Sequence, residues 1–189
     1  MAKTTQNFLT YAYRGKVGKQ YSLRIRDGRS FIAGLPERGV DRAQSPKQLA
    51  AREAFQRAAI YATSAMESAT LKEEYNQVRR GSQTAYNVAF QDAYFGPKLS
   101  DLRTLEYEGL AGQTMQVQAI DNFRVNKVKF TLLRPDGTKI EEGEAVLKDH
   151  NGLQWVYTAQ VDNTSVTGTM VRVTAADIPD NQTVMEVIL

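Results

Sequence analysis

Basic and aromatic side chains are concentrated near the N-terminus, where they could contact a nucleic acid. The basic residues between positions 14 and 29 include Arg14, Lys16, Lys19, Arg24, Arg26 and Arg29. Basic side chains neutralise phosphates, and the nearby Tyr11, Tyr13 and Tyr21 can stack on unpaired bases. The same residues are also typical of the open face of a hairpin, where they discourage pairing at a sheet edge. We favour this second interpretation, because the sequence contains no recognised nucleic-acid-binding module.

Carboxylate side chains in the C-terminal half could bind calcium. Asp121, Asp177 and Asp180 stand in predicted loops that could lie at one end of a β-sandwich. Calcium requires several oxygen ligands of this kind. Aspartate is also a preferred turn residue, and the spacing matches no helix–loop–helix calcium motif. The sequence therefore favours turn residues over a calcium site, and it predicts no cofactor.

Residues suited to catalysis are scarce. The chain has no cysteine, and its one histidine, His150, stands in a turn and cannot build a zinc site alone. Neither a G-x-S-x-G nucleophile elbow nor a phosphate-binding G-x-x-x-x-G-K-[ST] loop is present in the sequence. The acidic residues Glu141, Glu142 and Glu144 are expected to point to solvent rather than to form an acid/base pair. The sequence therefore predicts that the protein is not an enzyme.

A hairpin is predicted to position the N-terminal basic residues. Apolar residues alternate with polar ones from Tyr21 to Ile25, and Asp27-Gly28 then supplies a tight turn before a return strand. An isolated hairpin is marginally stable in water, so it must pack on another surface. The residues expected to contact a partner are Phe8, Tyr11, Tyr13, Tyr21, Leu23 and Ile25.

Three helices are predicted after the hairpin. The first opens with a capping box at residues 45–48, which has proline at the first helical position, and it continues to about Met66. Its predicted apolar stripe consists of Leu49, Arg52, Phe55, Ala59, Ala62 and Met66. The second helix is expected to begin with a cap at Thr70, and the third at Ser82 or Thr84.

The chain changes character after Gly96-Pro97, which ends the third helix and marks a predicted domain boundary. About seven strands with alternating apolar residues follow, separated by turns such as Pro135-Asp136-Gly137. Trp155 is expected at the centre of their core. The predicted architecture is α+β in two domains, a hairpin with three helices at residues 1–98 and an all-β sandwich at residues 99–189.

Two parts of the chain resemble known families. The C-terminal part resembles bacterial immunoglobulin-like modules in the stretches VQAIDN, VNKVKFTLLRPDGTKIEEGEA, WVYTA and GTMVRVTAADIPDNQT. Residues 14–92 resemble an uncharacterised family common in Bacteroidetes, in the stretches GKVG and AYNVA and at Ser45, Gln48, Arg52 and Phe55. The first resemblance implies an immunoglobulin-like fold, which hosts many roles, and the second implies no activity.

Charge differs between the two predicted domains. Residues 1–98 carry 16 Lys and Arg against 8 Asp and Glu, whereas residues 99–189 carry 8 against 13. Opposite charges favour head-to-tail association of copies. Because no apolar run is long enough for a bilayer and no secretory signal is visible, we expect no membrane contact. We expect a cytoplasmic protein, or one in an assembled particle.

The sequence as a whole predicts a non-enzymatic structural or interaction protein. It would form multimers with itself or bind another protein, as components of phage particles or surface assemblies do. The prediction depends on a hairpin too small to stand alone, on the opposite charges, and on an immunoglobulin-like module without a signal peptide. The alternatives are a nucleic-acid-associated protein that uses the basic hairpin, and a sandwich that binds a ligand or a carbohydrate.

Overall fold

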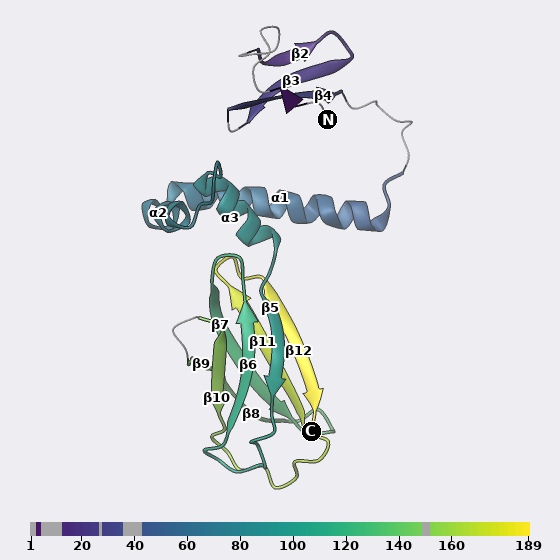
Figure 1. The fold of residues 1–189 in the computed structure, drawn as a ribbon. Coiled ribbons are helices and arrows are strands. Elements are labelled where there is room, and N and C mark those ends of the chain that lie inside the picture. Colours follow the sequence, from purple (N-terminus) through teal and green to yellow (C-terminus); the bar gives the residue numbers. More distant parts are fainter. Residues whose placement is uncertain (1–2, 5–12, 27, 36–42, 149–151) are drawn as a thin grey trace. The chain divides into compact units, whose positions relative to one another are not determined.

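The computed structural model describes residues 3–4, 13–26, 28–35, 43–148 and 152–189. Three helices and antiparallel sheets make the protein α+β (Figure 1). The chain divides into two compact units, Met1–Leu49 and Ala50–Leu189. The boundary predicted between residues 98 and 99 lies inside the second unit, where hydrogen bonds and an ion pair join the helices to loops between the C-terminal strands.

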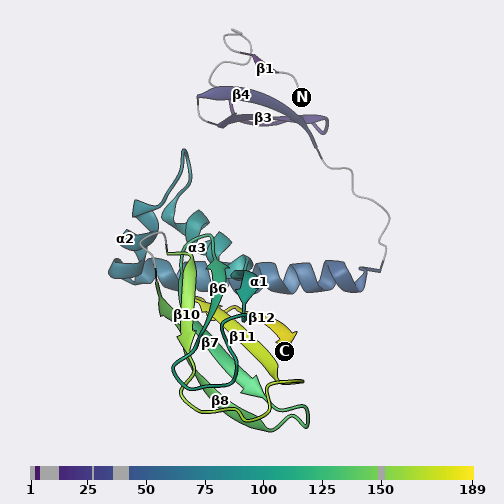
Figure 2. The same ribbon diagram turned by 60° about the horizontal axis from the view of Figure 1, so that its bottom comes forward.

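The first unit contains a four-stranded antiparallel sheet in place of a lone hairpin (Figure 2). Its strands are ordered β1-β4-β3-β2, with the bounds β1 Lys3–Thr4, β2 Gly15–Val17, β3 Tyr21–Arg26 and β4 Arg29–Gly34. The predicted hairpin forms the centre of this sheet, where Leu23 pairs with Ile32 and Arg24 pairs with Phe31. Gly28 has a φ of 70°, a conformation that glycine adopts without strain in such a turn.

Three helices follow, and the first begins as predicted. Their bounds are α1 Pro46–Glu67, α2 Ala69–Gln77 and α3 Ala85–Tyr94. The Ser45 hydroxyl accepts from the Gln48 backbone N–H at 3.3 Å, and the Gln48 side-chain oxygen accepts from the Ser45 N–H at 2.9 Å. These two reciprocal bonds are the expected capping box.

Side chains also cap the starts of α2 and α3. Ser68 Oγ accepts from the Leu71 backbone N–H at 3.4 Å, so the cap predicted at Thr70 is wrong and the helix begins earlier. Thr84 Oγ1 accepts from a backbone N–H in the first turn of α3 at 3.2 Å, which selects Thr84 over Ser82. Each cap satisfies an N–H group that the helix itself leaves without a partner.

The buried face of α1 agrees only in part with the predicted stripe, which included Ala62 and Met66 of the helical cluster. Ala58, Ala62 and Ala65 are buried, whereas Leu49 and Phe55 are 45% and 58% exposed. The C-terminal half of α1 packs in a cluster whose other buried members are Tyr75, Ala85, Val88 and Ala89. The contact of α1 with the other helices is made largely by alanines, because small side chains let neighbouring helices approach closely. The positions of the largest apolar side chains therefore do not predict which face is buried. Among the described residues, no helix combines the length and the apolarity required to cross a membrane.

The strands of the second unit form two antiparallel four-stranded sheets. One is ordered β5-β6-β10-β9 and the other β12-β11-β7-β8. Their bounds are β5 Lys98–Arg103, β6 Thr114–Ile120, β7 Val125–Leu133, β8 Lys139–Glu144, β9 Val146–Leu147, β10 Gln154–Thr158, β11 Met170–Asp177 and β12 Gln182–Ile188. Side chains from both sheets contribute to one apolar core between them.

The apolar alternation predicted for these strands is confirmed in the core. Every second residue of β6 from Met115 to Ala119 is buried, and the same holds for β7 from Val128 to Leu132. The Phe130 and Tyr157 rings stack with centroids 5.2 Å apart, and both side chains are almost fully buried. Trp155 is partly buried against this core, so Tyr157 and Phe130 occupy the place expected for Trp155.

Candidate functional site

The pairing register of the N-terminal sheet separates apolar from basic residues. Residues paired across antiparallel strands share a face, and neighbours along one strand lie on opposite faces. The apolar face, as we name it, consists of Val17, Tyr21, Leu23, Ile25 and Ile32. The opposite face, which we name the basic face, includes Lys16, Arg24 and Arg29 together with Phe31 and Ala33.

The apolar face is incompletely covered. Tyr21, Leu23, Ile25 and Ile32 are half-buried, and Val17 is 40% exposed. Ser22 is the one buried side chain among the described residues of the first unit. None of the apolar side chains described there is fully buried. Within that part of the chain, the sheet therefore lacks the second layer against which an apolar sheet face normally packs.

The other residues predicted for partner contact lie around this sheet. Tyr13 precedes β2 and is 62% exposed. Arg14 and Lys19 flank β2 and are exposed. Phe8 and Tyr11 lie outside the described residues, so the predicted role of the N-terminal arm stays a prediction.

A second candidate site lies where α3 meets the loops of the two sheets. Asp92 of α3, Asp121 after β6 and Asp177 at the end of β11 each place a carboxylate oxygen within 4.8 Å of the other two. We name these three residues the aspartate cluster. Asp92 and Asp177 are 0% and 1% exposed, and Asp121 is half-buried. Asp180, which the sequence grouped with Asp121 and Asp177, is exposed in the turn after β11 and is not part of the cluster.

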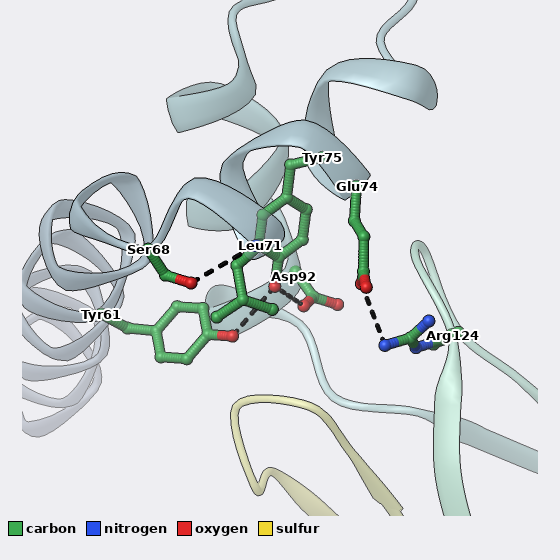
Figure 3. A network of polar contacts seen from close by, with 7 residues as sticks. All are labelled: Tyr61, Ser68, Leu71, Glu74, Tyr75, Asp92 and Arg124. Atoms are coloured by element: carbon green, nitrogen blue, oxygen red, sulfur yellow. Dashed lines mark hydrogen bonds and ion pairs between the residues drawn. The ribbon is translucent and has the colours of Figure 1, made fainter.

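Two tyrosines connect the cluster to the other helices (Figure 3). The Tyr75 hydroxyl of α2 donates to Asp92 Oδ2 at 2.6 Å, and the Tyr61 hydroxyl of α1 lies 2.9 Å from the Tyr75 hydroxyl. Burial raises the pKa of Tyr75 and of Tyr61, so both hydroxyls stay protonated. The chain of hydroxyls therefore ties all three helices to one buried carboxylate.

Asparagine side chains hold the sheet loops against the end of α3. The Asn181 backbone N–H donates to Asp177 Oδ1 at 2.7 Å, and Asn181 Nδ2 donates to Asp177 Oδ2 at 2.8 Å and to the Asp92 carbonyl at 3.2 Å. Asn122 Nδ2 donates to the Gln91 carbonyl at 2.8 Å. The Asp92 carbonyl is one that the end of a helix leaves unsatisfied, whereas the Gln91 carbonyl also accepts from the Phe95 backbone N–H.

Burial disfavours the charged form of the carboxylates in the aspartate cluster. Burial raises the pKa of Asp92 to about 7; the Tyr75 hydrogen bond opposes this shift and the neighbouring Asp121 adds to it. Burial also raises the pKa of Asp177, against the hydrogen bonds from Asn181. Among the described residues, no ion pair involves a member of the cluster. The arrangement therefore favours a bound proton or a bound cation.

Arg124, a basic residue near the aspartate cluster, pairs with a residue outside the cluster (Figure 3). Arg124 Nη2 lies 3.0 Å from Glu74 Oε2, which links the β6–β7 loop region to α2. The guanidinium also lies 5.3 Å from the centroid of the Phe123 ring, and that ring is 4.6 Å from the Tyr75 ring. Arg124 therefore pairs with the carboxylate of Glu74 and not with one of the cluster.

The acidic group on β8 is partly buried, contrary to expectation. Glu141 is 7% exposed, and its Oε2 accepts from the backbone N–H groups of Gln160 and Val161 at 2.9 and 3.2 Å. The solvent-facing orientation predicted for Glu141 is therefore wrong, because neighbouring strand residues point to opposite faces. Glu142 lies on the outer face and pairs there with Lys129 and Lys139. Glu141 therefore faces away from Glu142 and Glu144, which share the outer face of β8. His150 lies outside the described residues.

A hollow of about 380 Å³ lies on the outer face of the β5-β6-β10-β9 sheet. Its lining consists of Glu106, Thr114, Gln116, Val146, Lys148 and Val156. This surface is where the ligand- or carbohydrate-binding alternative would place its ligand.

Sequence reasoning identified two members of the aspartate cluster and missed the third. Asp92 falls at helical spacing from Ala85, Val88 and Ala89, on the face of α3 that is buried. An acidic residue at an otherwise apolar position of an amphipathic helix is the signal that could have identified it.

Comparisons of the chain with protein-family models, with curated proteins and with solved structures find no match.

Proposed function

We propose that the protein is a non-enzymatic structural protein that forms multimers through its N-terminal sheet. The observation that carries the proposal is the apolar face, on which no described side chain is fully buried and Val17 is 40% exposed. Covering such a face is favourable by about 25 cal/mol for each Å² of apolar surface removed from water. A second copy of the chain can provide the missing layer.

The net charges of the two units favour contact between the first unit of one copy and the second unit of another. Met1–Leu49 has 10 Lys and Arg against 3 Asp and Glu, a net charge of +7. Ala50–Leu189 has 14 against 18, a net charge of −4. Contact between the first unit of one copy and the second unit of the next brings opposite charges together, whereas contact between two first units brings like charges together. Head-to-tail contacts of this kind build rings or filaments.

In this proposal the two C-terminal sheets form an immunoglobulin-like sandwich. Two antiparallel four-stranded sheets around one apolar core support that assignment. A sandwich of this kind would serve as the body of the subunit in a particle or a surface assembly, and the small N-terminal sheet would make the contact. The sandwich itself supports no particular activity, because this architecture hosts many roles.

Paired variants on the two faces of the N-terminal sheet test the proposal. Leu23→Thr combined with Ile32→Thr removes apolar surface from one face and keeps residues that suit a strand. Arg24→Lys changes a side chain on the opposite face of the same strand and keeps its charge. In sedimentation velocity, the double variant should dissociate, and the Arg24 variant should keep the wild-type distribution. Equal behaviour of the two variants would contradict assembly through the apolar face.

A nucleic-acid-associated role is the second candidate, and the basic face supports it. Lys16, Arg24 and Arg29 share one face of the sheet, and no described residue of the first unit forms an ion pair with them. Binding to phosphates would fall steeply with salt. Fluorescence anisotropy with a single-stranded oligonucleotide should then show binding at low salt that is lost in Arg24→Glu combined with Arg26→Glu. Salt-independent binding, or none at low salt, would remove this candidate.

A further inference from the structure

The aspartate cluster brings together three segments that are distant in the sequence. Asp92 comes from α3, Asp121 follows the last residue of β6, and Asp177 ends β11. All three carboxylates offer an oxygen within 4.8 Å of the others. The cluster therefore lies where the helical region is attached to loops of both sheets.

Two oxygens in the cluster have no hydrogen-bond donor among the described residues, although the Asp92 and Asp121 carboxyls are close enough to share a proton. They are Asp92 Oδ1 and Asp121 Oδ1, and both atoms are buried. The Asp92 side chain is completely shielded from solvent, and its other oxygen is occupied by Tyr75. A buried carboxylate oxygen without a partner costs free energy, because it loses its water and gains nothing in return. These two oxygens therefore need either a proton that they share or a cation that both bind.

The surroundings of the cluster favour a positive ligand. Three carboxylates lie together, and the described residues supply no lysine or arginine to pair with them. Asp92 also stands near the C-terminus of α3, where the helix dipole is negative. Asn181 donates hydrogen bonds to Asp177 and thereby fixes the orientation of that carboxylate. Such outer hydrogen bonds commonly orient the carboxylates that bind a metal ion.

The ligand atoms and their spacing select the class of ion. The cluster offers carboxylate oxygens and neither histidine nor cysteine, which disfavours zinc. Calcium binds oxygens at 2.3–2.6 Å, so ligands of one ion can stand up to about 5 Å apart. Magnesium requires near-ideal octahedral geometry and usually keeps several waters, which a site around the completely buried Asp92 disfavours. We propose that Asp92, Asp121 and Asp177 form a calcium-binding site that fastens α3 to the loops of both sheets.

Calcium binding to this site would stabilise the second unit. An ion that binds the folded chain and not the unfolded chain raises the melting temperature as its concentration increases. The effect should be specific for calcium, since sodium at equal ionic strength supplies screening without bridging the carboxylates. The inference does not depend on multimer formation, because every ligand comes from one chain.

The test uses the full-length protein after treatment with EDTA. Calcium chloride is titrated while binding is followed by calorimetry and melting is followed by circular dichroism. One ion per chain should bind, and the melting temperature should rise by several degrees. Sodium chloride at matched ionic strength should not reproduce the rise. No binding at millimolar calcium, or an equal rise with sodium, would overturn the proposal and leave a shared proton as the partner of the free oxygens.

Two matched variants assign the site. Asp121→Asn removes one charge at a half-exposed position and should lower calcium affinity at least tenfold while the chain still folds. Asp180→Asn is the control, because Asp180 is exposed in the neighbouring turn and lies outside the cluster. Its calcium affinity should equal that of the wild type. Equal affinity in both variants, or a loss confined to the Asp180 variant, would overturn the assignment.

Discussion

The Tyr75 hydroxyl donates a 2.6 Å hydrogen bond to Asp92 Oδ2, and both side chains are 0% exposed. This bond joins α2 to α3 and satisfies one of the two oxygens of the most deeply buried carboxylate of the cluster (Figure 3). A hydrogen bond to a charged or partly charged group is among the stronger ones in proteins. The attachment of the helices to one another therefore depends on a polar contact as well as on the alanine-rich core.

Replacing Tyr75 tests the strength of that contact. Tyr75→Phe keeps the ring and leaves a second oxygen of Asp92 without a partner. We expect the free energy of unfolding to fall by about 1.5–3 kcal/mol, as for the loss of other hydrogen bonds to charged groups. Urea unfolding followed by the fluorescence of Trp155, the one tryptophan in the chain, measures the change. Tyr86→Phe on α3, where the side chain is 36% exposed, should change little; equal losses in both variants would contradict the account.

The raised pKa of Asp92 predicts how stability depends on pH in EDTA. The pKa is about 7 in the folded chain and near 3.8 for an unperturbed aspartate, so the folded state binds more protons between these values. The stability associated with the protonated group is fully present below about pH 4 and is lost as the pH rises through about 7. Tyr75, Asp121 and Asp177 face this carboxylate, and burial raises the pKa of Asp177 as well.

Asp92→Asn isolates this contribution, because the amide resembles the protonated acid and does not titrate. The difference in melting temperature between the variant and the wild type should grow in favour of the variant as the pH rises toward about 8. Parallel melting curves for the two proteins across this range would show that Asp92 titrates normally.

Asn181 is predicted to be the most sensitive asparagine in the junction. Its Nδ2 donates to the Asp92 carbonyl and to Asp177 Oδ2, so Asn181→Asp removes these donors and adds a fourth carboxylate. We expect a loss of about 2 kcal/mol or more in EDTA, and a smaller loss in calcium. Asn87→Asp is the matched control, since an acid in the first turn of α3 interacts favourably with the helix dipole. A loss from Asn87→Asp as large as that from Asn181→Asp would refute the prediction.

Gly143 on β8 is predicted to tolerate no side chain. A Cβ at this position would stand 2.7 Å from the Tyr157 ring, which itself stacks on Phe130 in the core. Gly143→Ala should therefore lower the free energy of unfolding by about 1–3 kcal/mol. Gly34→Ala serves as the control in the same unfolding assay, because a Cβ at Gly34 would have no neighbouring atom within 4 Å. An unchanged midpoint in the Gly143 variant would show that the ring moves aside at little cost.

Local patterns were sufficient for much of the fold. The alternation from Met115 to Ala119 predicted a buried strand, and the Ser45–Gln48 capping box predicted the start of α1, because both depend on residues close in the sequence. The buried face of α1 was predicted in part: Ala62 of the predicted stripe is buried, whereas Ala58 was not predicted and Phe55 is 58% exposed. Residue size alone does not show how closely two helices approach.

The candidate sites were harder to predict because they depend on pairing and on distant contacts. Alternation within β3 was visible in the sequence, but β1 and β2 complete the sheet through pairings that no local pattern specified. Asp121 and Asp177 stood out as loop carboxylates, whereas Asp92 joined them through the packing of α3 on the sheet loops. A single sequence does not show which loops meet, so the cluster became visible in the structure.

The most direct test of the central claim is the absolute mass of the full-length chain in solution. Light scattering after size exclusion in moderate salt measures it without reference to shape. Assembly through the N-terminal sheet predicts a mass several times 21.1 kDa, discrete for a closed ring and rising with protein concentration for a filament, which decreases as salt weakens the attraction between unlike units. A mass of 21.1 kDa at every protein concentration would contradict the claim that this protein forms multimers.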